Sequence, residues 1–184
     1  MAPGVAPGGG IAQGGGRSPR HLIYASHEMV EAIRQGDIPG VQLRCRQRLA
    51  VPPAVAWRWL TEPRLLASWA GRAGIEGGLE GTLELTWEEG TTTVRERGRT
   101  LEIDIGRLWA LAFERLEDGW ERSTRLVFEL TAEGDGSELS VLQQGFEHLP
   151  LSRCLTIWES YRRRWRRALT RLVESLESRE EKKE

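Results

Sequence analysis

Hydrophobic and polar residues alternate with a period of two along much of the chain between residues 41 and 146, which is typical of β-strands with one buried face. The first predicted strand spans residues 41–51. Its apolar face consists of Val41, Leu43, Cys45, Leu49 and Val51, and arginines and glutamines take most of the other face. We therefore predict a half-buried strand at the start of the ordered region.

Two short helices are predicted directly after this strand. The prolines at 52 and 53 end the strand and can open a helix at its first turn. The apolar stripe of this helix is Val55, Trp59 and Leu60. Pro63 begins a second helix, which carries Leu65, Leu66 and Trp69 and stops near Gly71.

Further strands are predicted from residue 77 to residue 146. A strand ending in Trp87 leads into a turn at 88–90, and residues 91–105 form a long polar strand whose alternation is compatible with a bulge. Residues 108–115 form the next strand, followed by a turn at 117–119. The last two strands carry Leu126, Phe128 and Leu130, and then Leu139, Val141 and Gln143, on either side of a hairpin turn at 133–136. Because the strands are consecutive and turn-linked, the sheet should be antiparallel.

The ordered region ends in one long helix over residues 151–177. Its apolar residues recur at three- and four-residue steps, as expected for a helix that lies on a sheet; they are Leu155, Trp158, Trp165, Leu169, Leu172 and Leu176. Outside this region, residues 1–20 are rich in Gly and Pro and are predicted to be disordered. Residues 21–40 should form a short helix and a linker, and residues 178–184 a charged tail.

Composition narrows the class of protein. The 184 residues carry a formal net charge of −1, which argues against a nucleic-acid partner. No run of about 18 apolar residues predicts a membrane span, and the first twenty residues do not resemble a secretory signal, so we expect a cytoplasmic protein. Cys45 and Cys154 are too few for a disulfide framework or a four-cysteine zinc site, and we expect buried free thiols, no metal and no cofactor.

Three stretches resemble one known group of proteins. Residues 51–71 are similar to the opening of its domain, with an Ala/Pro helix entry, Thr-acidic-Pro and Leu-Leu-x-x-Trp. Residues 126–146 are similar to its last hairpin, including the closing Gly-Phe. The spacing of Trp165, Leu169 and Leu172 is similar to the pattern of its final helix. The chain thus resembles the helix-grip domains of the START and polyketide-cyclase-like superfamily. Among these it is most similar to the bacterial homologues of the C-terminal domain of the heat-shock-protein-90 ATPase activator.

The resemblance implies an α+β fold for residues 41–177. In this fold a curved antiparallel sheet of about six strands wraps around the long C-terminal helix, and two short helices follow the first strand. Two positions depart from the family pattern: Arg164 stands where Gly often precedes the helix tryptophan, and Gln143 stands where His is often found in the last strand.

Such a fold leaves a cavity between sheet and helix, which is expected to be mostly apolar with a few polar groups. The candidate ligand-binding residues are Trp69, Trp87, Phe128, Gln143, Trp158 and Trp165. The alternative is that these large side chains simply fill the core.

No catalytic set is predicted. His148 and Cys154 could form a pair, but no third member accompanies them. The strand carboxylates Glu84, Glu96, Glu102 and Glu114 are predicted to be surface ion-pair partners. The five arginines among residues 162–167 are predicted to form a solvated helix face, with Glu159 pairing with Arg163.

The leading functional hypothesis is therefore binding of a small apolar or aromatic molecule, without evident catalysis. One alternative is a protein-interaction or chaperone-regulating domain with a protein partner. The other is an enzyme of the cyclase or hydrolase kind that uses a buried acid or base.

Overall fold

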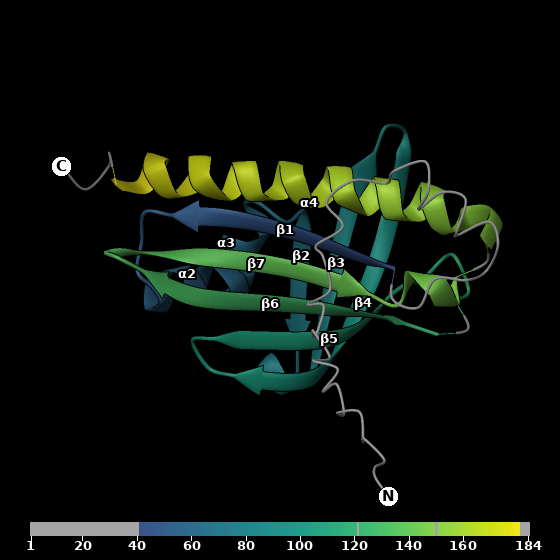
Figure 1. Ribbon diagram of the computed structural model, residues 1–184, viewed down its shortest axis with the longest axis horizontal. Coiled ribbons are helices and arrows are strands. Elements are labelled where there is room, and N and C mark those ends of the chain that lie inside the picture. The colour runs from purple at the N-terminus through teal and green to yellow at the C-terminus, as the bar shows by residue number, and fades with distance from the viewer. Residues whose placement is uncertain (1–40, 121, 150, 181–184) are drawn as a thin grey trace, which may run out of the picture.

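The computed structural model describes residues 41–120, 122–149 and 151–180. An antiparallel sheet of seven strands, in the order β1-β7-β6-β5-β4-β3-β2, carries the long helix α4 along one face (Figure 1). The predicted N-terminal tail, the helix at 21–40 and residues 181–184 lie outside the described residues. The fold is the predicted α+β helix-grip arrangement.

The first strand and the two short helices are formed as the prolines predict. Strand β1 spans Gln42–Leu49, helix α2 Pro53–Thr61 and helix α3 Pro63–Ala67, and both helices have Pro at their start. The predicted stripe of α2 is wrong at Val55, which is 37% exposed. The helix instead buries Ala56, Trp57, Trp59 and Leu60.

The sheet contains one strand more than the sequence pattern predicts. Strand β2, Arg72–Glu76, pairs with β3 and forms one edge of the sheet. It was missed because only Ala73 and Ile75 alternate within five residues, and Gly74 between them adds no side chain to the pattern. A short 3₁₀ turn, η1 (Gly78–Glu80), connects it to β3.

The remaining strands follow the prediction closely. They are β3 (Thr82–Glu89), β4 (Thr92–Asp104), β5 (Leu108–Arg115), β6 (Thr124–Glu133) and β7 (Gly136–Gln144). The irregular register that a bulge would produce lies between Thr100 and Glu102 of β4. Gly98 is opposite Phe113, and a Cβ there would lie 2.9 Å from the phenyl ring, so this strand position accommodates a neighbouring aromatic side chain.

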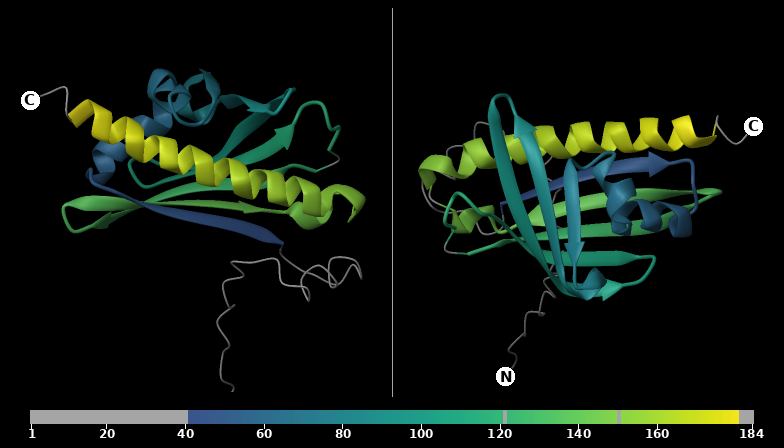
Figure 2. Two further views of the ribbon diagram at one scale, coloured as in Figure 1. Left: turned by 90° about the horizontal axis from the view of Figure 1, so that it is seen from above. Right: turned by 180° about the vertical axis from the view of Figure 1, so that it is seen from behind.

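Helix α4 spans Leu151–Glu180, three residues beyond its predicted end, and follows a short 3₁₀ turn, η2 (Phe146–His148). The predicted stripe faces the sheet: Trp158, Trp165, Leu169, Leu172 and Leu176 are buried, and Leu155 is half-buried. Seen from above, the helix runs along the length of the sheet, with α2 and α3 beside its C-terminal half (Figure 2). One core thus joins α4, the inner face of the sheet and the two short helices.

Candidate functional site

A cavity of about 430 Å³ lies where the β3–β4 hairpin meets the middle of α4. The hairpin rises beside the helix in the view from behind (Figure 2). The strand side of the cavity is Trp87, Glu88, Glu89 and Gly90, and the helix side is Ser160, Arg163, Arg164, Arg167, Ala168 and Arg171. Charged side chains thus make up six of its ten lining residues, in contrast to the mostly apolar cavity expected from the sequence.

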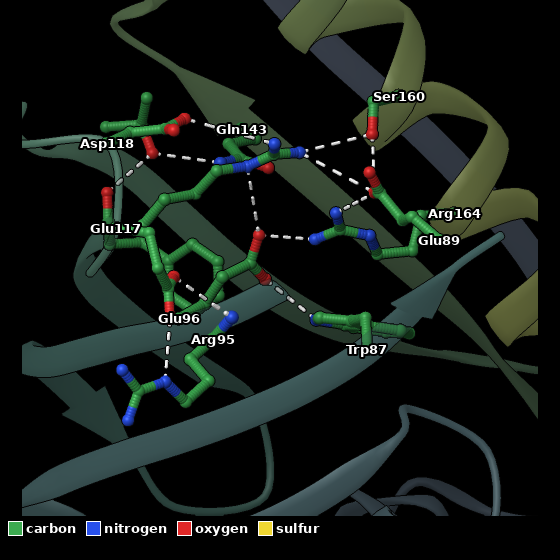
Figure 3. Close-up of polar contacts among 12 residues, drawn as sticks. Trp87, Glu89, Arg95, Glu96, Glu117, Asp118, Gln143, Ser160 and Arg164 are labelled. Carbon is green, nitrogen blue, oxygen red and sulfur yellow. Dashed lines mark hydrogen bonds and ion pairs between the residues drawn. The ribbon is translucent and has the colours of Figure 1, made fainter. Parts of the chain in front are cut away.

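Arg164, which lines this cavity, forms a buried ion pair with Glu96 (Figure 3). Glu96 of β4 is fully buried, and its two carboxylate oxygens are both engaged. Arg164 donates a hydrogen bond to Oε1, and the Trp87 indole N–H donates to Oε2 at 2.7 Å. The Arg164 guanidinium also stacks over the Trp87 ring, 5.0 Å from its centroid.

A second carboxylate, Glu89, ties the tip of β3 to the helix. Arg164 and the Ser160 hydroxyl both donate hydrogen bonds to its Oε1, the latter at 2.6 Å. Arg115 of β5 lies 3.6 Å from both Glu89 and Glu96. Burial raises the pKa of Glu89, but the hydrogen bonds from Ser160 and Arg164 and the two arginine charges outweigh burial and lower it. Two carboxylates are therefore balanced by two guanidiniums inside the fold.

The prediction that the strand carboxylates are all surface ion-pair partners is wrong for Glu96, and it also fails for Glu114, which is half-buried and belongs to none of the ion pairs among the described residues. It holds for Glu84, which pairs with Arg97, and for Glu102, which pairs with Arg125. The sequence did contain a signal for Glu96. Residues 95, 97 and 99 are arginines on the outer face of β4, so the residues between them must point inward.

The prediction of a fully solvated arginine face is wrong at Arg164, which is buried. Glu159 pairs with Arg162, three residues on, rather than with Arg163. Arg163 and Arg167 are exposed and line the cavity, and Arg171 continues their four-residue spacing. Arg171 was not predicted as a site residue, because it lies outside the arginine cluster at residues 162–167. Its four-residue spacing from Arg167 is nevertheless visible in the sequence.

The six candidate ligand-binding residues are all buried, and they fall into three places. Trp87, Phe128 and Trp165 form one cluster in which the Trp165 ring lies edge-to-face with the other two, at 5.6 Å from each. Trp69 donates its indole N–H to the Trp59 carbonyl at the corner of the short helices. Trp158 donates to the Gln42 carbonyl of β1 at 3.2 Å.

Gln143, the sixth candidate, belongs to a buried chain of hydrogen bonds. Its amide oxygen accepts from the Trp165 indole at 3.1 Å, and its amide nitrogen donates to the Thr124 hydroxyl at 2.9 Å. That hydroxyl donates to the Phe113 carbonyl. Of the six candidates, Trp87 lines the cavity beside α4, and Trp165 with Phe128 packs directly behind it.

His148 and Cys154 do not pair with each other. The Cys154 thiol donates to the Phe146 carbonyl, and His148 lies 3.7 Å from Glu147. Both cysteines are free and buried, as predicted, and burial raises the pKa of each thiol. Within the described ranges, no group of three His, Cys, Asp or Glu side chains is placed to hold a metal ion.

None of the helices in the described part of the chain has the length and apolar character needed to cross a membrane.

The long helix packed on a curved antiparallel sheet defines a helix-grip protein of the START and polyketide-cyclase-like superfamily. Residues 50–177 match the model of the family described as "Activator of Hsp90 ATPase homolog 1-like protein". The chain belongs to this family, which confirms the resemblance seen in the sequence.

Solved structures share the fold at low sequence identity. Protein CV1439 from Chromobacterium violaceum has 19% identity and a TM-score of 0.59, over 74% of this chain and 96% of that one. Protein Ms6760 from Mycobacterium smegmatis has 11% identity and a TM-score of 0.63, over 73% and 90%. DynU16, encoded in the dynemicin biosynthetic locus, has 17% identity and a TM-score of 0.59, over 74% of this chain and 47% of DynU16. No curated protein is similar enough in sequence to count as a match.

Proposed function

We propose that the protein binds a small organic molecule in the cavity between the β3–β4 hairpin and α4. The observation that carries the proposal is the cavity itself, whose volume of about 430 Å³ falls in the range of small-molecule sites. The family and the fold are compatible with a ligand held between sheet and helix.

Two of the lining side chains, those of Trp87 and Arg164, are held in place without a ligand. Trp87 is held by its hydrogen bond to Glu96, and Arg164 by its bonds to Glu96 and Glu89. Side chains positioned in this way lose little conformational entropy on binding, which favours affinity. In this proposal Trp87 and Ala168 meet the apolar or aromatic part of the ligand, and Trp165 and Phe128 support Trp87 from behind.

The geometry gives less support to catalysis. A buried carboxylate would be the natural acid or base, and Glu96 is fully buried. Both of its oxygens already accept hydrogen bonds from the protein, so a ligand would have to displace Arg164 or Trp87 to reach it. The protein-interaction hypothesis rests on the family description alone.

The proposal can be tested by NMR titration with two-ring aromatic compounds, with and without an acidic group: 2-naphthoate, 2-naphthyl phosphate and 2-naphthamide. We expect at least one of them to shift the Gly90 and Ala168 amide signals and the Trp87 indole signal. No shift with any compound, or shifts confined to residues remote from the cavity, would contradict the proposal.

A matched pair of variants on α4 tests whether the probes occupy the cavity. Arg163→Trp places a bulky ring among the lining residues, and Arg166→Trp places the same ring at an exposed position of the same helix outside them. We expect Arg163→Trp to weaken binding of every probe that binds, the neutral amide included, at least about tenfold. Arg166→Trp should leave binding unchanged. Native mass spectrometry of protein purified from its own host should then show the mass of the natural ligand.

A further inference from the structure

Three exposed arginines of α4 line the cavity on one side. Arg163, Arg167 and Arg171 are spaced four residues apart, so they lie above one another along the same helix face. All three residues therefore border the same cavity.

These arginines differ from their neighbours in having no acidic partner. Arg162 pairs with Glu159, and Arg164 pairs with Glu89 and Glu96. Across residues 41–120, 122–149 and 152–179, no carboxylate lies within 4.0 Å of Arg163, Arg167 or Arg171.

The acidic residues of the opposite wall do not neutralise them. Glu89 is occupied by Arg164 and Ser160. Glu88 accepts a hydrogen bond from Thr93 and lies 3.4 Å from Arg72, on the outer side of the hairpin. With these acids engaged elsewhere, the cavity retains three uncompensated positive charges. A concave wall of protein concentrates the field of such charges and attracts anions.

We propose that the ligand of this cavity carries an oxyanion, a carboxylate or a phosphate, which Arg163, Arg167 and Arg171 bind. This inference rests on the proposed small-molecule function and names the ligand's chemical class. Guanidinium groups suit such a ligand because they donate paired hydrogen bonds to carboxylate and phosphate oxygens. The ligand is thus amphipathic: its acidic group faces the arginines, and its apolar or aromatic part faces Trp87 and Ala168.

This assignment changes the ligand class expected from the sequence. A purely apolar molecule would leave the three guanidiniums beside it without partners and partly stripped of water, which is unfavourable. An acidic group on the ligand would instead pair directly with the guanidiniums.

The test compares three probes of the same ring size: 2-naphthoate, 2-naphthyl phosphate and neutral 2-naphthamide. We expect at least one anion to bind at least about tenfold more tightly than the amide, because hydrogen bonds between charged groups are stronger than neutral ones. The ratio of the two anions then tells carboxylate from phosphate. Raising NaCl from about 50 to about 500 mM should weaken anion binding and leave amide binding unchanged.

Arg167→Gln and Arg166→Gln form a matched pair of variants. Both remove one positive charge from neighbouring exposed positions of α4, but only Arg167 lines the cavity. Arg167→Gln should weaken binding of the tighter-binding anion about tenfold and leave amide binding unchanged, whereas Arg166→Gln should change neither. Comparable affinities for anion and amide, with no effect of Arg167→Gln, would overturn the oxyanion assignment and leave the proposed small-molecule function standing. Failure of all three probes to bind would overturn both.

Discussion

At the scale of single residues, the buried pair of Glu96 and Arg164, of which Arg164 lines the cavity, should carry much of the local stability. Replacing Glu96 by Gln leaves the buried Arg164 charge with Glu89 as its remaining close partner. Breaking a buried pair from one side typically costs about 3–5 kcal/mol. We expect urea denaturation to show a loss of that order for Glu96→Gln, and about 0–1 kcal/mol for the exposed control Glu84→Gln.

A double-mutant cycle tests whether the loss comes from the stranded charge. Removing Arg164 as well, as Arg164→Met, takes away the charge that Glu96→Gln would leave buried. The combined loss should therefore be clearly smaller than the sum of the two single losses. Strict additivity of the two substitutions would contradict this account of the pair.

Tyr161 should make the protein sensitive to alkali. Its side chain is fully buried, and burial raises its pKa well above the ordinary value of 10.0, with the nearby Glu96 charge acting in the same direction. A group whose pKa is raised in the folded state stabilises that state below its unfolded pKa, and the contribution is lost as the pH rises further. Unfolding free energies measured from pH 8 to 11 should fall above about pH 10.

The Tyr161→Phe variant isolates this contribution. The buried thiols of Cys45 and Cys154 also lower the unfolding free energy of the protein as the pH rises, because burial raises their pKa from the ordinary value of 9.0. Tyr161→Phe should therefore retain the decline that begins near pH 9 and lose the additional decline above pH 10. An unchanged curve would show that Tyr161 does not hold its proton in the folded state.

Sequence patterns predict that Glu96 and Arg164 are buried, but not that they form a pair. Arg164 follows Tyr161 by three residues and precedes Ala168 by four, so helical periodicity places it on the buried stripe. Strand alternation does the same for Glu96 between outward-facing arginines. The sequence does not show that Glu96 and Arg164 contact each other, because 68 residues separate them along the chain. The contact forms only where the β3–β4 hairpin approaches α4.

At the scale of elements, the arginine spacing that forms the anion site should weaken α4 in the free protein. Arg167 has like charges four residues away on both sides, at Arg163 and Arg171. Each such pair costs about 0.2–0.5 kcal/mol, and Gln has a similar helix propensity to Arg. Arg167→Gln should thus stabilise the ligand-free protein by roughly 0.4–1 kcal/mol in urea denaturation at low salt.

Salt provides the control for this prediction. High ionic strength screens the exposed arginines, so the gain from Arg167→Gln should shrink as NaCl is added. Destabilisation by this substitution would instead mean that Arg167 makes a favourable contact in the free protein. The combination of higher stability and weaker anion binding would identify Arg167 as a residue retained for the ligand rather than for the fold.

Most elements could be predicted because their patterns are long. Strands β5, β6 and β7 and helix α4 each present three or more buried positions at a regular spacing. Strand β2 could not be predicted, since five residues with a central glycine at the sheet edge give too short a pattern. Helix α2 was predicted with a partly wrong face, because a helix of only nine residues allows more than one apolar stripe.

At the scale of the whole molecule, the fold was predictable and the character of the cavity was not. The order of the elements and the three family-like stretches predict the helix-grip fold from the sequence alone. The lining of the cavity depends on which side of α4 the hairpin approaches, and the periodicity of either element alone does not specify that. Of the aromatic residues predicted for the site, Trp87 lines this cavity and the others pack in the core, whereas most of the lining comes from charged residues of hairpin and helix.

A single shared core implies that the molecule unfolds as one unit. Buried tryptophans come from all of its parts: Trp57 and Trp59 from α2, Trp87 and Trp109 from the sheet, and Trp158 and Trp165 from α4, with Trp69 just after α3. Tryptophan fluorescence therefore reports the packing of the whole core, whereas far-UV circular dichroism reports mainly the 30-residue α4. The two denaturation curves should coincide, as expected for a two-state transition. A helical signal that outlasts the fluorescence change would mean that α4 is stable without the sheet. This is unfavourable because most helical stability in proteins comes from packing of the apolar face, and the exposed arginine pairs of α4 repel one another.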